Sequence, residues 1–205
     1  MPVAKHGITA NTPNNLILNA GTFYKNLVYS GGAWNGTILG ATSGGGTISF
    51  TPEYFEPQID GATVSVKNMI WKVGETASIK VTLTEVNPSL FTDALHLVAS
   101  TADNVANVHT VWTTKSQIGP SDYLNNIAYV GTLSSGTTII FILPNPICLG
   151  ALEISPKDKE NATYEVEFKG TATFAQEELN YIPYKIYYPQ QPAAPLSAPP
   201  APEEP

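Results

Sequence analysis

The sequence predicts a mainly β protein built from antiparallel sheets, with a single helix. Several short runs alternate apolar and polar residues, as strands do when one face is buried. Glycine, proline and asparagine separate these runs and supply the turns. Only the stretch that begins at Asn87-Pro88-Ser89 combines a helix-start signal with apolar residues on one helical face. These observations favour strands throughout, with one helix between the two halves of the chain.

Length and composition suit one domain with extensions at both ends. The chain has 205 residues, and 42% of them are hydrophobic. We assign residues 1–15 to a polar N-terminal arm, 16–188 to the domain and 189–205 to a tail that holds seven of the 17 prolines. Such a tail cannot form helix or sheet and is expected to be extended. The single cysteine, Cys148, lies between apolar neighbours and is interpreted as a buried structural thiol.

The first strands are expected before residue 31. Leu16–Asn19 and Thr22–Ser30 are apolar and aromatic runs, with Asn19-Ala20-Gly21 as a turn between them. A glycine-rich segment, 31–46, follows and contains turn signals. Trp34 within it is either an exposed interface anchor or a side chain that folds back onto the core.

Two alternating runs, Thr47–Thr51 and Ala77–Glu85, form the centre of the pattern. Residues two apart in a strand point to the same face, which gives each run an apolar stripe. The stripes consist of Ile48 and Phe50 in the first run, and Ala77, Ile79, Val81 and Leu83 in the second. About 25 residues separate the runs, well above the usual connection length. A segment of this length is functional, disordered, or ordered by something outside the domain.

The second half of the chain predicts further strands. A short one is expected over Val108–Thr114. Thr137–Leu143 is apolar on both faces, so it is either a central strand or buried at a subunit contact, and Leu149–Ile154 is a candidate to pair with it. Alternation over 161–174 and an aromatic run at Tyr181–Tyr188 complete the prediction.

The sequence contains no local signature of an enzyme, a cofactor site or a metal site. Nucleophile-elbow, HExxH, Walker and Rossmann motifs are all missing. Ser43-Gly44-Gly45-Gly46 lacks the lysine and the following helix of a phosphate loop. His96 has no second ligand at metal spacing apart from Asp93 and is expected to face solvent. Glu165 and Glu167 read as a solvated strand face. We therefore expect a protein that is not an enzyme and binds no cofactor or metal.

Charge restricts the possible partners. The net charge is −7, and all ten basic residues are lysines. Arginine supplies bidentate contacts to phosphate and guanine, so its absence argues against sequence-specific nucleic-acid binding. An acidic protein can still surround DNA and repel it, which would give a low-friction wall. No stretch has the length and apolar character of a membrane span or a signal peptide, so we expect a soluble protein synthesised in the cytoplasm.

A set of motifs in the first half of the chain resembles the major tail tube proteins of long-tailed, siphovirus-type bacteriophages. They are Asn19-Ala20-Gly21 before an aromatic strand, Leu39–Phe50 with its glycines, Ile59-Asp60-Gly61, Val66-Lys67, and the Glu75–Glu85 strand that leads into a helix. These are turn and strand motifs, and their order and spacing carry the resemblance.

The resemblance covers residues 16–97 best and continues more weakly through 164–188. It implies an antiparallel β-sandwich or barrel with one flanking helix. Six copies would join edge to edge in a ring with a continuous inner barrel, and rings would stack into the tail tube of the virion. The tape-measure protein would occupy this tube, DNA would pass through it, and tail terminator and distal tail proteins would be further partners.

The same resemblance implies that residues 52–68 are ordered by an adjacent subunit. Candidate subunit-interface residues are Gly44, Gly45, Gly46, Pro52, Tyr54, Phe55, Pro57, Asp60 and Gly61. The glycines are interpreted as hinges for docking. Two alternatives remain open at this point: the inner tube of a contractile injection device, and a monomeric β-sandwich that binds carbohydrate or a cell surface through Trp34, Trp71 or Trp112.

Overall fold

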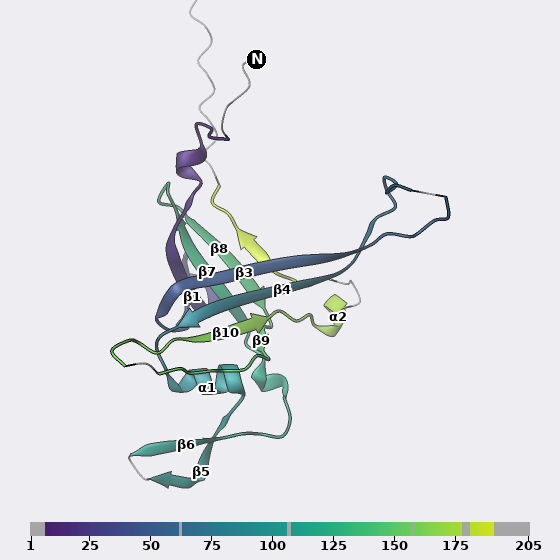
Figure 1. The fold of residues 1–205 in the computed structure, drawn as a ribbon. Coiled ribbons are helices and arrows are strands. Elements are labelled where there is room, and N and C mark those ends of the chain that lie inside the picture. Colours follow the sequence, from purple (N-terminus) through teal and green to yellow (C-terminus); the bar gives the residue numbers. More distant parts are fainter. Residues whose placement is uncertain (1–6, 62, 106–107, 157, 178–180, 191–205) are drawn as a thin grey trace, which may run out of the picture.

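A computed structural model describes residues 7–190 except 62, 106–107, 157 and 178–180 (Figure 1). Part of the predicted arm, 1–6, and most of the predicted proline-rich tail, 191–205, lie outside the described residues. The near part of the arm contains a 3-10 turn, Thr12–Asn14, and the Asn14 carbonyl accepts a hydrogen bond from the Ser135 amide at 3.3 Å. The end of the arm that joins the domain therefore lies against the five-stranded sheet.

The described residues form a mainly β fold with antiparallel sheets, as predicted. The five-stranded sheet has the order β11 (Lys185–Tyr187), β8 (Thr138–Pro144), β7 (Asn126–Leu133), β1 (Ile17–Ser30) and β2 (Ala33–Ile38). The four-stranded sheet has the order β3 (Thr42–Phe55), β4 (Trp71–Leu83), β10 (Tyr164–Lys169) and β9 (Ile147–Cys148). A separate pair joins β5 (Val98–Val105) to β6 (His109–Thr113), and the helices are α1 (Pro88–Leu95), α2 (Phe174–Glu177) and a 3-10 turn at Pro120–Asp122. Over the described residues the sheets resemble a sandwich and do not close into a barrel.

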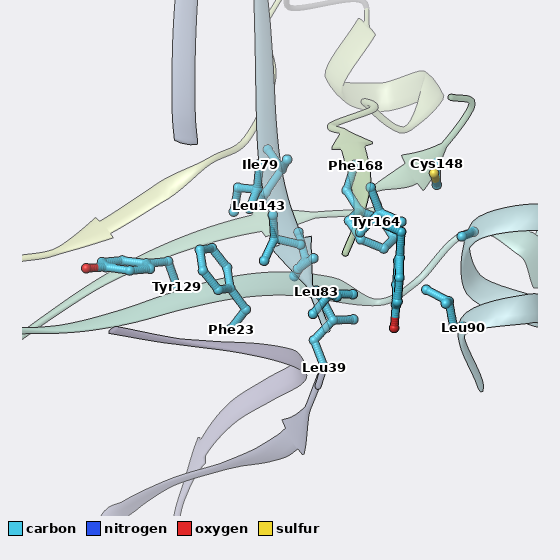
Figure 2. Close-up of a cluster of buried hydrophobic side chains, with 14 of the residues drawn as sticks. Phe23, Leu39, Ile79, Leu83, Leu90, Tyr129, Leu143, Cys148, Tyr164 and Phe168 are labelled. Atoms are coloured by element: carbon cyan, nitrogen blue, oxygen red, sulfur yellow. The ribbon is translucent and has the colours of Figure 1, made fainter. Parts of the chain in front are cut away.

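The main core lies between the two larger sheets and is closed at one end by α1 (Figure 2). The five-stranded sheet supplies Phe23, Ile127, Tyr129 and Leu143. The four-stranded sheet supplies Ala77, Ile79, Val81, Leu83, Tyr164, Val166 and Phe168. This confirms the apolar stripe predicted for Ala77–Leu83 and places the alternating residues of β10 on the same side. Cys148 is buried in this core as predicted, and burial raises the pKa of its thiol.

β1 is one strand where the sequence predicted two with a turn between them. Asn19 and Gly21 have positive φ, as expected of turn residues, but the chain continues in the same direction. The register with β7 shifts between Leu18 and Thr22, so the extra residues form a bulge. The predicted turn at Gly31-Gly32 is present, and it returns the chain as β2, a strand that the sequence analysis missed.

Trp34 on β2 folds back instead of standing free in solvent. It packs against a second buried cluster, on the outer face of the five-stranded sheet, formed by Leu27, Ala128, Ile140 and Ile142. This cluster also explains why β8 is apolar on both faces. β8 lies between β7 and β11 in the sheet. Of the two predicted options, a central strand or a strand buried at a subunit contact, the structure therefore shows the first.

The helix begins as predicted. Asn87 caps α1 by accepting a hydrogen bond from the Leu90 amide at 3.1 Å, and Pro88 occupies the first turn. The expectation that His96 faces solvent is wrong. His96 ends the helix in a left-handed conformation, its side chain is only 12% exposed, and its Nε2 lies 2.6 Å from the Cys148 carbonyl oxygen.

Strand pairing after the helix also departs from expectation. The predicted strand near residues 108–114 is β6, and its partner β5 was not predicted. The suggested pairing of Leu149–Ile154 with β8 is wrong, because those residues are not in a strand. β9, just before them, pairs instead with β10. Local composition does not encode which distant strand accepts a short segment.

Candidate assembly interface

The β3–β4 hairpin continues well past the rest of the molecule (Figure 1). β4 pairs with both β3 and β10 over Ser78–Leu83, but from Thr76 outward its only partner is β3. The prediction of a connector of about 25 residues is therefore wrong in length, because β3 runs on to Phe55 and β4 already starts at Trp71. We call residues 51–55 and 71–76, which pair only with each other, the ribbon. A two-stranded ribbon is marginally stable in water without further cover.

Large apolar side chains are exposed on the ribbon and on the loop at its end. Phe55 and Trp71 are cross-strand partners whose rings stack with centroids 6.3 Å apart, and they are 53% and 49% exposed. The other exposed members are Tyr54, Ile59, Val64, Val66, Ile70 and Val73. We call these eight residues the tip patch. Eight exposed apolar side chains on one projecting element favour an interaction site there.

A polar and aromatic cluster fixes the point where the ribbon leaves the body. The Glu75 carboxylate, on a side chain only 5% exposed, accepts hydrogen bonds from Lys72 Nζ at 2.8 Å and from the Tyr184 hydroxyl at 3.1 Å. The Tyr184 ring packs on the Phe50 ring, with ring centroids 4.2 Å apart. Burial, followed by the hydrogen bond to Glu75, raises the pKa of Tyr184. The body thus anchors the ribbon at Glu75, and everything beyond that residue projects freely.

The loop at the end of the ribbon has its own shape. Residues 56–70 surround a hollow of about 300 Å³ that Pro57, Ile59 and Asp60 help to line. Gly61 turns the chain with a φ of +85°.

The predicted interface residues fall into two groups. Pro52, Tyr54, Phe55, Pro57, Asp60 and Gly61 lie together on the ribbon and its loop. Gly44, Gly45 and Gly46 lie at the base of the same hairpin, inside β3. A Cβ on Gly46 would lie 2.5 Å from both the Lys80 carbonyl oxygen and the Phe23 ring, so tight packing requires this glycine and the hinge interpretation fails there.

The β4 half of the tip patch was not predicted from the sequence as an assembly surface. Trp71 and Val73 continue the odd-numbered spacing of Ala77, Ile79, Val81 and Leu83 toward the start of the strand. That spacing was the signal available. The glycine at position 74 and the charges beside it hid the signal, because they resemble a loop.

The three tryptophans of the carbohydrate alternative do not form one platform. Trp34 packs against the outer cluster. Trp112 on β6 packs against Phe91 of α1, with ring centroids 6.1 Å apart. Trp71 stacks on Phe55 at the far end of the ribbon. Of the three, Trp71 is the one that is half exposed and lies on the ribbon. Trp71 belongs to the tip patch.

The described part of the chain contains no group of three or more His, Cys, Asp or Glu side chains arranged to hold a metal ion. None of its helices has the length and apolar character needed to cross a membrane.

Comparison of the sequence with models of protein families and with curated proteins finds no match. Comparison of the fold with solved structures finds similarity to a chain described as "Tail of empty GTA particle computed with helical refinement, C6 symmetry". The two chains are 8% identical, with a TM-score of 0.39, over 75% of this chain and 92% of the other. The functional assignment below rests on the sequence motifs and on the hairpin.

Proposed function

We propose that this chain is a structural protein that assembles with copies of itself into stacked rings, forming the tail tube of a long-tailed phage virion. The role is not catalytic. By the family resemblance, six copies form each ring, the tape-measure protein fills the tube before DNA passes, and terminator and distal tail proteins cover its ends.

One observation of the structure carries this proposal: the ribbon with its tip patch. A two-stranded ribbon is barely stable alone, and this ribbon and the loop at its end together expose eight large apolar residues. The arrangement is unfavourable in a protein that remains monomeric. It becomes favourable when another copy covers the patch, because burial of apolar surface then stabilises both the ribbon and the contact. The glycine and strand motifs that resemble tail tube proteins frame the same hairpin.

Electron microscopy of the purified full chain at increasing concentration tests the proposal. Rings or tubes are expected for the natural sequence. The double substitution of Phe55 and Trp71 to serine should leave a folded protein, since both side chains lie outside the core, and should abolish assembly. Phe174→Ser is the matched control, because Phe174 is 89% exposed on α2 and its loss removes a similar apolar surface elsewhere. A natural chain that stays monomeric at every concentration contradicts the proposal.

A further inference from the structure

A second hollow lies at the base of the hairpin, where the two sheets open toward solvent. It has a volume of about 570 Å³ and is lined by Ile17, Ala20, Gly45, Ile48, Phe50 and Phe141, among others. None of its lining residues carries a charge at neutral pH. We call it the base hollow. Apolar and aromatic walls around a volume of this size suit an apolar ligand or side chain.

The glycines of β3 leave one wall of the base hollow bare. A Cβ on Gly44 would meet nothing within 4 Å, and one on Gly45 would meet only Ala20, at 3.6 Å or more. β3 is also an edge strand: among the described strands only β4 is hydrogen-bonded to it, so its outer edge carries no paired strand. Glycine in a strand often marks a place where another backbone or a ligand approaches closely. The base hollow is therefore open on the side where β3 is exposed.

We infer that the base hollow of one copy receives the Phe55–Trp71 pair of a second copy. This inference rests on the proposed function and names the surface that covers the tip patch. Phe55 and Trp71 are about half exposed, and large aromatic side chains bury about 150–250 Å² each, so seating the pair buries roughly 150–250 Å² of it. The rest of the tip patch would then lie against the surface around the base hollow and supply the remainder of the ~800 Å² per partner of a stable protein interface.

Electrostatics favour the same contact. Copies of a chain with a net charge of −7 repel one another, so contacts between charged surfaces are unfavourable. Phe55 and Trp71 carry no charge, and neither does the lining of the base hollow. Docking the Phe55–Trp71 pair in the base hollow brings two copies together without burying an unpaired carboxylate from either surface.

The placement of both surfaces on one strand dictates how the contact propagates. Gly45 and Phe55 are ten residues apart on β3, which corresponds to roughly 33 Å at about 3.3 Å per residue. The tip of one copy cannot bind its own base, and the two surfaces differ, so the contact is heterologous. Heterologous contacts repeat and generate rings or filaments, not closed two-fold dimers. Successive copies should be offset by about 30–35 Å along the hairpin direction.

The decisive experiment mixes two variants that are each unable to assemble. The tip variant carries Phe55→Ser and Trp71→Ser. The base variant carries Ala20→Glu, which places a charge over the base hollow at an exposed position. Val108→Glu adds the same charge at a 65% exposed position in the turn just before β6 and serves as the control. Circular dichroism and thermal melting establish that each variant is folded.

Each variant alone is expected to remain a monomer of 21.9 kDa in light scattering after size-exclusion chromatography. An equimolar mixture should form a heterodimer of twice that mass and no larger species, because the pair retains one intact tip and one intact base hollow. The Val108→Glu control should assemble like the natural chain.

The other outcomes separate the two proposals. If the natural chain forms tubes but Ala20→Glu also forms tubes, the tip binds elsewhere and this inference is overturned while the proposed function stands. If each variant is monomeric but the mixture yields no heterodimer, the base hollow is not the receptor and the inference is again overturned. If the natural chain itself never assembles, both proposals fail.

Discussion

Gly46 shows how a single residue can be mistaken for a flexible element. In the sequence it belongs to a run of three glycines, which suggests a hinge. In the structure a Cβ on Gly46 would lie 2.5 Å from the Lys80 carbonyl oxygen and 2.5 Å from the Phe23 ring, so there is no room for it. The residue is therefore glycine because of a close approach between β3, β4 and β1.

We predict that Gly46→Ala destabilises the fold by roughly 1–3 kcal/mol, the usual cost of overpacking a core. Urea denaturation of the chain measures this difference. Gly119→Ala is the control, because a Cβ there meets nothing within 4 Å and its φ is −117°. Equal stability of the two alanine variants would show that β3 can move away from Phe23.

Asp122 is the second residue with a specific role. Its side chain is 5% exposed, pairs with Lys115, and accepts a hydrogen bond from the Gly119 amide at 2.7 Å. Burial acts to raise the pKa of this carboxyl, but the hydrogen bonds from Lys115 and Gly119 and the nearby charges outweigh burial and hold the pKa below the ordinary value of an aspartate. The folded state therefore binds the proton less readily than the unfolded chain.

A carboxyl with a lowered pKa stabilises the fold above its unfolded pKa of about 3.9. That stabilisation is lost as the pH falls through the folded value. We predict that Asp122→Asn costs about 1.5–3 kcal/mol near neutral pH, the range for a hydrogen bond to a charged group. The difference from the natural chain should shrink below about pH 4. Urea denaturation at several pH values checks this, and a gap independent of pH would contradict the ionic role.

Among the elements, the β3–β4 hairpin has two parts with different stability. Over Ser78–Leu83, β4 lies between two strands above the core, whereas the ribbon has no third strand. Local opening is easiest where few buried contacts hold the backbone. The ribbon should open often in the free chain and rarely once a second copy covers it.

We predict that the backbone amides of residues 51, 53–55 and 71–76 exchange with deuterium faster than those of 78–83 in the monomer. In assembled material the ribbon amides should become protected, while those of 78–83 change little. Hydrogen exchange read by mass spectrometry on both samples tests this. A ribbon already protected in the monomer would remove the need for a partner.

Considered as a whole molecule, the chain combines a net negative charge with a proposed contact between copies that is uncharged. Its net charge is −7 and its pI is about 4.8. Raising the salt concentration from ~0.01 M to ~0.1 M shortens the Debye length from about 30 Å to about 10 Å. Repulsion between copies weakens accordingly, while burial of the tip patch is not reduced.

We predict that the critical concentration for assembly falls as salt rises over this range. Sedimentation of assembled material at a series of protein concentrations gives the value directly. Phe174→Ser should follow the natural chain. A critical concentration that rises with salt would mean that ion pairs, not the apolar tip patch, hold the copies together.

The sequence by itself determined the properties that depend on nearest neighbours and on alternation. The cap and first turn of α1, the buried face of Ala77–Leu83, the alternation in β10, the two-sided apolarity of β8 and the burial of Cys148 all follow from local patterns, and the structure confirms them. About two-thirds of the predicted interface residues, those from Pro52 to Gly61, also lie together on one projecting element.

Only the tertiary structure decided which distant segments meet. The sequence does not state that β9 pairs with β10, that His96 turns inward to Cys148, or that Trp34 folds over the outer cluster, because each depends on contacts far along the chain. The same holds for the hairpin. Alternation places side chains on a face, but only the position of the neighbouring strands leaves Phe55 and Trp71 beyond the core, exposed and available to a second copy.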